Sequence, residues 1–182
     1  RGTVTAALKG CKVIVVDPAM CNTAAWAANN GGEWVPIRPG TDNHLLGAIL
    51  RYILEKGYED KEFIAKQTKG FDEFAKEFKS YWNKTDSNGL KYFSLEWAEE
   101  KTTISKDKIK EIAELIGTTK PGAVVWGMNG IGHRFAGYIA SMFGTAIDVV
   151  TGNLEAPGGV IDCNQVRISK DGYAGHFNGR EI

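Results

Sequence analysis

Four consecutive β-branched residues, Val13 to Val16, lead directly into Asp17 and Pro18. An uninterrupted apolar run of this kind is typical of a strand that is buried on both faces of a parallel sheet, and we expect a strand over 12–17. Two more short runs, Glu33 to Ile37 and Ala123 to Trp126, are also expected to be strands. Because helical patterns separate the three runs, the sequence predicts an α/β fold with a mostly parallel sheet.

The clearest helical pattern runs from Leu45 to Leu54, where apolar side chains return to one face. Gly57 is placed to end this helix, Asp60 to cap the next, and Ser105 to cap a later one. The other segments expected to be helical are 23–28 behind a capping Asn22, 71–78, 95–100, and a long helix before Gly152 with Phe135, Ile139, Met142, Phe143, Ala146 and Val150 on one face. The polar stretch 80–92 is expected to be a surface loop.

These elements predict a three-layer, Rossmann-like domain over residues 1–162. Residues 163–182 have little apolar periodicity and contain three glycines, so we expect an irregular connecting segment there. The chain begins Arg1-Gly2-Thr3, with no initiator Met and no signal peptide. We therefore expect it to be a fragment of a longer protein.

Charge and cysteine content exclude several classes of function. The 182 residues carry 22 basic and 22 acidic side chains, which argues against a general nucleic-acid binder because phosphate neutralisation needs a basic excess. No run of 18 apolar residues occurs, so no membrane span is expected. Cys11, Cys21 and Cys163 show no CxxC spacing, which predicts reduced thiols and no zinc or iron–sulfur site.

The segments that follow the three expected strands are unusually rich in groups that bind ligands. They are Asp17-Pro18-Ala19-Met20-Cys21, then Pro39-Gly40-Thr41-Asp42, then Gly127-Met128-Asn129-Gly130-Ile131-Gly132-His133. In an open α/β sheet, ligands bind beyond the carboxyl ends of the strands. A carboxylate there can accept hydrogen bonds from a ribose or from the N–H edge of guanine, and glycines let backbone amides approach a phosphate. Together the three segments suit a nucleotide.

Each of these residues also has an ordinary structural explanation. Asp17 can simply end a strand, Asp42 can cap the following helix, and Cys21 can be a small packed residue. The glycines at 127–132 match neither GxGxxG nor a P-loop, so that turn alone is a weak signal. A lone His133 at a helix start is usually solvated, and Trp126 and the phenylalanines at 71, 74 and 78 are expected in the core.

Four segments in order resemble one family, the molybdenum or tungsten oxidoreductases related to dimethyl sulfoxide reductase. They are KVIVVDPAMCNTAAWA (12–27), IRPGTDNHLL (37–46), GYEDKEFIAKQTKGFDEF (57–74) and DVVTGNLEAPGG (148–159). The resemblance extends from about residue 8 to 162. It implies that residues 1–162 form the α/β domain that binds one guanine dinucleotide of a bis(molybdopterin guanine dinucleotide) cofactor.

By motif position, the resemblance places Asp17, Pro18 and Cys21 at the nucleotide, together with Gly40, Thr41 and Asp42. Asp42 is the candidate for guanine, since its two oxygens can accept a pair of N–H bonds. Gly127, Met128 and Gly130 match a loop that approaches the cofactor, and His133 or Arg134 is expected to face the active-site funnel.

This sequence departs from the family pattern at two places. Relatives commonly have Arg after the Asp-Pro pair and Thr two residues later, where this chain has Ala19 and Cys21. The chain also lacks the upstream region that carries the metal ligand and an iron–sulfur cluster in relatives. The implied partners are therefore the other domains of a parent catalytic subunit and an iron–sulfur electron-transfer subunit, and the isolated fragment is not expected to turn over.

Two alternatives remain open at this point. The chain can be a self-contained α/β nucleotide-binding module with a regulatory role, which predicts saturable binding of adenine nucleotides. It can also be a scaffold domain that binds no ligand. The substrate, the choice between molybdenum and tungsten, and the compartment do not follow from the sequence.

Overall fold

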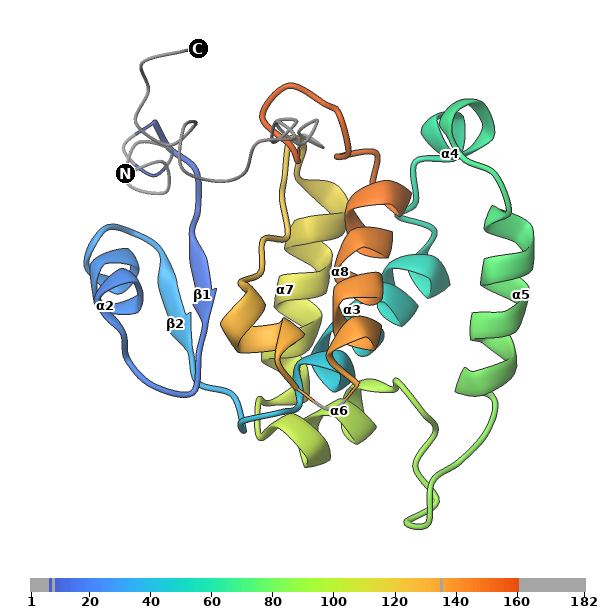
Figure 1. The fold of residues 1–182 in the computed structure, drawn as a ribbon, viewed down its shortest axis with the longest axis horizontal. Helices are drawn as coiled ribbons and strands as arrows, with labels where there is room; N and C mark the ends of the chain where they lie inside the picture. The colour runs from blue at the N-terminus through green and yellow to red at the C-terminus, as the bar shows by residue number, and fades with distance from the viewer. Residues whose placement is uncertain (1–6, 8, 135, 161–182) are drawn as a thin grey trace, which may run out of the picture.

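The structure is a computed structural model that describes residues 7, 9–134 and 136–160, and for residues 128 and 129 the backbone only. A small parallel sheet lies on one side of the molecule, next to a larger group of helices (Figure 1). The predicted connecting segment 163–182 and Phe135 lie outside the described residues. No helix in the described part of the chain is long and apolar enough to cross a membrane.

The sheet is a β–α–β unit. Strand β1 (Ile14–Val16) pairs in parallel with β2 (Glu33–Val35), and helix α2 (Asn22–Asn29) connects them. Val15 lies opposite Trp34 in the register, and Asp17 N donates to Val35 O at 3.3 Å just beyond the paired residues. The carboxyl ends of both strands therefore reach the same edge of the sheet, which is the lower edge in Figure 1.

Helix α3 (Asp42–Lys56) is the centre of the helical part. It packs against α6 (Leu95–Thr102), α7 (Lys106–Thr118) and α8 (Gly137–Val150). The fully buried side chains that join these helices are Ile49, Leu50, Ile53, Ile109, Ile147 and Val150. Burial of each such aliphatic side chain is worth about 1.5–3 kcal/mol, so this contact supplies much of the driving force for folding.

Two short helices, α4 (Lys61–Gln67) and α5 (Phe71–Trp82), cover the far side of α8 (Figure 1). Helix α5 is attached through aromatic rings. Phe78 lies with its ring centroid 5.1 Å from Phe93 and 5.5 Å from Phe143 of α8. The predicted core position of Phe78 is confirmed, while Phe71 and Phe74 are only partly buried at its margin.

The predicted helix boundaries hold where a local capping residue sets them. Gly57 ends α3 in a left-handed conformation, with φ of 71°. Asp60 accepts a hydrogen bond from Phe63 N, and Ser105 accepts one from Lys108 N. The predicted cap by Asn22 is wrong, because helix α2 already includes Asn22 and its N-cap is Cys21, without a side-chain hydrogen bond.

The predicted third strand, 123–126, is not formed in the described part of the chain, where the sheet has two strands. The predicted three-layer arrangement is therefore not confirmed. Val125 is 84% exposed instead of buried. One side chain of α8 and one from the segment after it take the place of a neighbouring strand: Asp148 Oδ1 accepts from Val124 N and Asn153 Oδ1 accepts from Gly122 N, each at 2.9 Å. The segment is therefore held by α8 and not by the sheet.

The long last helix carries its apolar residues on the predicted face with one exception. Phe143, Ile147 and Val150 are buried, and Ile139 and Ala146 are partly buried against the core. Met142 is 57% exposed. The predicted assignment of Met142 to the buried face is wrong, because it lies one residue before Phe143 and points toward the groove beside α5.

Candidate functional site: the carboxyl edge of the sheet

The first candidate segment forms a tight turn directly after β1. Asp17 Oδ1 accepts from Ala19 N at 2.9 Å, and Cys21 N donates to Ala19 O at the same distance. The indole of Trp34 donates to Asp17 O at 2.9 Å. One carboxylate oxygen of Asp17 is thus engaged by its own turn, while Pro18 and Cys21 are exposed beside it.

The second segment connects β2 to α3. Gly40 has a φ of 84°, a conformation that glycine adopts without strain. Thr41 is the N-cap of α3, but its hydroxyl donates to Arg38 O at 2.7 Å and does not cap the helix. Asp42 is the first residue of α3, and its carboxylate makes no hydrogen bond or ion pair with any described residue. The alternative that Asp42 caps the helix is therefore wrong.

The third segment is a single π-helical turn, Met128–Gly132. Ile131 N donates to Gly127 O at 3.1 Å. A Cβ atom added to Gly127 or Gly130 would meet no atom within 4 Å, so both glycines border open space. The turn therefore leaves room for a ligand to approach its backbone at these two positions.

Arg134 brings the second and third segments together. Its Nε donates to Gly130 O at 3.1 Å, and its guanidinium lies over Gly40, where an added Cβ would stand only 2.6 Å from Nη1. Gly40 and Gly130 are far apart in the sequence, so this one side chain joins two of the three predicted segments. The predicted convergence of Asp17 with Asp42 stays a prediction, although their segments end neighbouring strands.

The backbone before the π-turn is positioned by α8. Besides the hydrogen bonds that Asp148 and Asn153 accept from this backbone, the ring of Trp126 packs on Gly144, where an added Cβ would lie 2.6 Å from Cζ3. Asp148 is 2% exposed, and burial raises the pKa of its carboxyl to about 6. Trp126 is half-buried and does not belong to the core, so its predicted core position is wrong.

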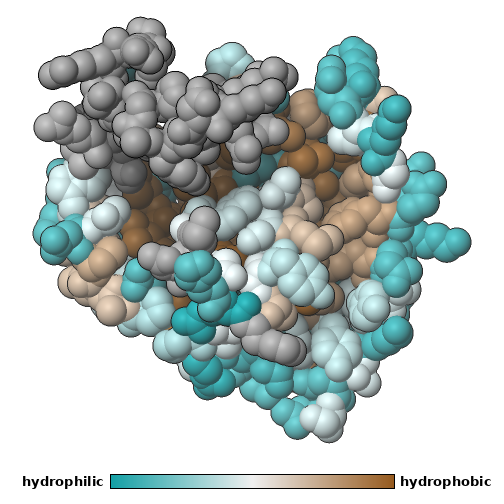
Figure 2. Space-filling view, in the orientation of Figure 1, coloured by the Kyte–Doolittle hydropathy of each residue, from teal (hydrophilic) through white to brown (hydrophobic). Residues whose placement is uncertain are grey.

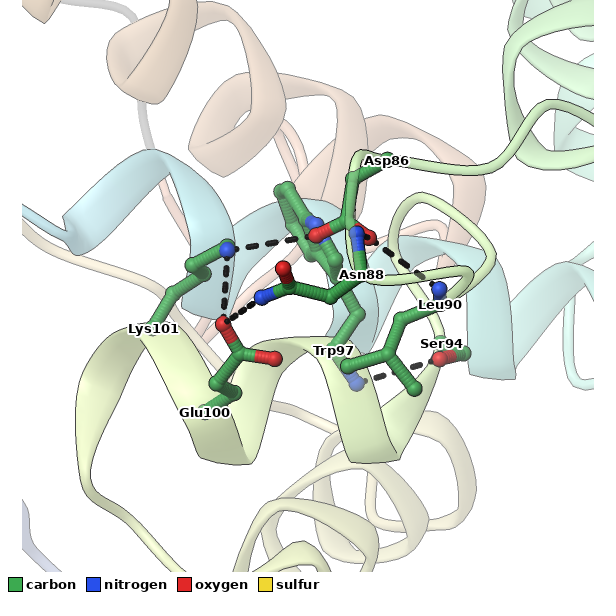
Figure 3. Close-up of polar contacts among 7 residues, drawn as sticks. All are labelled: Asp86, Asn88, Leu90, Ser94, Trp97, Glu100 and Lys101. Atoms are coloured by element: carbon green, nitrogen blue, oxygen red, sulfur yellow. Dashed lines mark hydrogen bonds and ion pairs between the residues drawn. The ribbon is translucent and has the colours of Figure 1, made fainter.

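A polar network joins α6 to the loop that precedes it (Figure 3). Lys101 of α6 pairs with Asp86 at 3.2 Å and with Glu100 at 2.9 Å, and Asp86 also accepts from Leu90 N at 3.1 Å. The imidazole of His44, in the first turn of α3, packs against Trp97 of α6 with ring centroids 4.8 Å apart and the rings tilted by 31°. Burial, helped by the charge of Lys101, lowers the pKa of His44.

Comparison with known proteins identifies the family. Dimethyl sulfoxide reductase DmsA of Haemophilus influenzae is 30% identical over 161 residues, which are 84% of this chain and 19% of that protein. Arsenate respiratory reductase molybdopterin-containing subunit ArrA of Shewanella sp. is 30% identical over 179 residues, 90% of this chain and 20% of that protein. Formate dehydrogenase H of Escherichia coli is 29% identical over 154 residues, 85% of this chain and 19% of that protein.

The chain belongs to the dimethyl sulfoxide reductase family of molybdopterin oxidoreductases. It spans about a fifth of the length of these relatives. No family model matches the chain. Acetylene hydratase from Pelobacter acetylenicus has the same fold, with a TM-score of 0.67 and 23% identity over 82% of this chain and 18% of that one. The family implies a cofactor of molybdenum and molybdopterin.

The described residues contain no group of three or more His, Cys, Asp or Glu side chains that could hold a metal ion. Cys11 and Cys21 are exposed free thiols, as predicted, and Cys163 lies outside the described part. An unpaired carboxylate, two open glycines and a guanidinium fit the nucleotide end of such a cofactor.

A separate groove of 670 Å³ lies between α8 and the junction of α4 with α5. Hydrophobic surface gathers there in Figure 2, and Tyr138 and Met142 are 70% and 57% exposed along it. None of the residues predicted to contact the nucleotide lines this groove. Gly132, at the end of the π-turn, does line the groove, so the groove adjoins the third candidate segment.

Sequence reasoning missed two features of the site. Asp148 and Asn153 belong to the quoted DVVTGN segment, yet their role in holding 121–126 was not predicted; a buried acid within an apolar helix face was the available signal. Arg134 was expected to face the funnel, but no local pattern indicates its contact with Gly40.

Proposed function

We propose that this chain is the domain of a larger molybdopterin oxidoreductase that binds the guanine end of one molybdopterin guanine dinucleotide. The observation that carries the proposal is the contact of Arg134 with Gly40, beside the unpaired carboxylate of Asp42. A carboxylate that can accept hydrogen bonds from a nucleobase, two glycine-containing turns and a positive charge then lie at the carboxyl ends of a parallel sheet. Nucleotides bind at this place in α/β folds.

In this proposal Asp42 accepts two hydrogen bonds from the N–H edge of guanine. Backbone groups near Gly40, Gly127 and Gly130 contact the sugar and the diphosphate, because no Cβ keeps the ligand away. Asp17 has one carboxylate oxygen left for the ribose. Pro18, Cys21 and Thr41 are proposed to contact the nucleotide as neighbours of these groups, as is the backbone of Met128.

The parent enzyme is proposed to carry a bis(molybdopterin guanine dinucleotide) with molybdenum or tungsten, together with an iron–sulfur cluster, in regions outside this chain. The metal and its pterins supply the two-electron or oxo-transfer chemistry, and the protein supplies position and electrostatics. The proposed partners are the remaining domains of the catalytic subunit and an iron–sulfur electron-transfer subunit. The chain alone is proposed to be inactive.

We also propose that the sheet is larger in the parent enzyme, as a three-layer Rossmann-like fold over 1–162 requires. Val125 is 84% exposed although its segment is extended and rich in valine, which supports pairing with a further strand. Residues 163–182 are proposed to connect this domain to the next.

A titration with guanosine diphosphate followed by amide NMR tests the proposal. We expect shifts at 17–21, 40–42 and 127–130, and weaker shifts with adenosine diphosphate. Asp42→Asn should remove the preference for guanine while the rest of the spectrum is preserved. Asp72→Asn, an exposed carboxylate on α5, is the matched control.

Three other outcomes have distinct meanings. Equal or tighter binding of adenosine diphosphate would favour the self-contained regulatory module. No response to either nucleotide would favour a scaffold without a ligand. Binding of guanosine diphosphate that is unaffected by Asp42→Asn would leave a nucleotide site but remove Asp42 from the guanine edge.

A further inference from the structure

A guanidinium from a segment far along the chain lies over Gly40. The β1 tip, Asp17 to Cys21, contains no basic residue. Arg134 instead reaches the strand-end edge from the segment that follows the π-turn. A positive charge is thus present at this edge, but from the third segment and not from the first.

The geometry fixes where this charge lies. Nε of Arg134 is bound to Gly130 O at 3.1 Å, which holds the plane of the guanidinium. Nη1 lies 2.6 Å from the place of a Cβ on Gly40, so the absence of that side chain is what admits the guanidinium. An alanine at position 40 would displace Arg134 and would also be strained at a φ of 84°.

The rest of the guanidinium is available to a ligand. Among the described residues, Nη1 and Nη2 form no hydrogen bond or ion pair, and Arg134 is exposed. A guanidinium presents a planar set of donors that matches two phosphate oxygens, and such charge-assisted bonds are about twice as strong as neutral ones. The carboxylate of Asp42, two residues after Gly40, stays unpaired with it and remains free for the base.

We infer that Arg134 binds the diphosphate of the guanine dinucleotide, with Gly40 and Gly130 fixing its guanidinium and Asp42 binding the base. This inference rests on the proposed function. It assigns phosphate binding to Arg134, which lies outside the β1 tip. Recognition of the phosphate charge is then separate from recognition of guanine. Loss of Arg134 should then affect the phosphate but not the base.

Affinities of the full 182-residue chain for guanosine diphosphate and for guanosine, measured by calorimetry or NMR, test this separation. Arg134→Gln should lower the affinity for guanosine diphosphate by about tenfold and leave the affinity for guanosine unchanged, because one charged hydrogen-bonding partner of the phosphate is lost. The loss should shrink at high salt, where the wild-type affinity also falls. Arg134→Lys keeps the positive charge but lacks the planar set of guanidinium donors, so its affinity for guanosine diphosphate should be intermediate.

Two variants serve as controls. Lys76→Gln removes one positive charge from an exposed position on α5, away from the sheet, and should change neither affinity. Arg38→Gln removes the exposed arginine that precedes the Gly40 turn. If Arg38→Gln abolishes the preference for the diphosphate and Arg134→Gln does not, the wrong arginine has been assigned.

The remaining outcomes distinguish the two proposals. Tight binding of guanosine diphosphate that Arg134→Gln does not change overturns the role of Arg134 and leaves the proposed function intact. If Arg134→Gln lowers the affinity for guanosine and for guanosine diphosphate equally, Arg134 does not bind the phosphate, because it then acts on the nucleoside or on the loop. Absence of binding of both ligands to the wild-type chain overturns the proposed function, and this inference with it.

Discussion

Asp148 Oδ1 accepts a hydrogen bond from Val124 N at 2.9 Å, while Oδ2 is buried without a hydrogen-bond partner in the described part of the chain. One buried acid of α8 therefore fixes the extended segment that leads into the π-turn. Burial disfavours the charged form of this carboxyl and raises its pKa to about 6, although the hydrogen bond from Val124 N acts in the opposite direction.

The first prediction concerns the pH dependence set by Asp148. Its folded-state pKa lies above the unfolded value of 3.8, so the folded protein binds the proton more tightly and loses stability as the pH rises toward 6. Relative to Asp148→Asn, the wild-type free energy of unfolding should fall by roughly 2–3 kcal/mol over this window. Urea denaturation of both proteins at several pH values measures it. A difference that is constant with pH would contradict the assignment.

The second prediction concerns His44. Its pKa is lowered mainly by burial, so the unfolded chain takes up the proton more readily, and stability should fall as the pH drops below the ordinary value of 6.5. His44→Gln should remove this part of the acid dependence, although loss of the ring contact with Trp97 will lower stability at every pH. The slope of unfolding free energy against pH is therefore the quantity to compare. His133→Gln, at an exposed position, is the matched control for loss of a histidine.

The third prediction separates two roles of Asp60, which caps α4 and accepts from Lys120 Nζ at 2.6 Å. Asp60→Ala should cost about 1–2 kcal/mol, because the cap and the ion pair are both lost. Asp60→Asn keeps the cap and should cost about 0.5 kcal/mol, since the pair is partly exposed. Chemical denaturation at neutral pH gives both values.

The pH dependence of these variants follows from the lowered pKa of Asp60, whose main cause is the hydrogen bond from Lys120. The ionised carboxylate stabilises the fold above its unfolded pKa, and this stabilisation is lost as the pH falls through the folded pKa. The wild type and Asp60→Asn should therefore converge in acid. Equal gaps at neutral and acid pH would argue that the ion pair contributes nothing.

The fourth prediction tests the contact between Trp126 and α8. Gly144→Ala places a methyl group 2.6 Å from the indole and should destabilise the chain by about 1–3 kcal/mol, with a red shift of tryptophan emission as the ring moves out. Gly127→Ala, next to open space, should stay within about 0.5 kcal/mol of the wild type. If both variants change the free energy of unfolding equally, the position of the Trp126 ring does not depend on the absence of a side chain at Gly144.

Local signals in the sequence predicted the helices well. Gly57, Asp60 and Ser105 act through bonds to residues a few positions away, so a short window contains all that determines them. The strand at 123–126 was predicted from its valines, but a strand also needs a neighbour. Side chains of Asp148 and Asn153 take that position, and nothing in the segment itself indicates them.

The candidate site was predictable as a set of turns but not as a geometry. The order of the motifs placed Asp17, Asp42 and Gly127 at strand ends, and parallel pairing of β1 with β2 puts the first two segments at one edge. The contact of Arg134 with Gly40 joins residues from separate elements. It depends on how α3 and α8 pack, which no local pattern encodes.

The two-stranded sheet leaves β1 and β2 each with an outer edge that pairs with no other described strand. Unpaired backbone groups at such an edge are a template for another chain, and the exposed Val16 and Val125 add apolar surface nearby. Purified samples should therefore self-associate as concentration rises, and lysines introduced along these edges would be the rational way to keep the protein monomeric for nucleotide titrations.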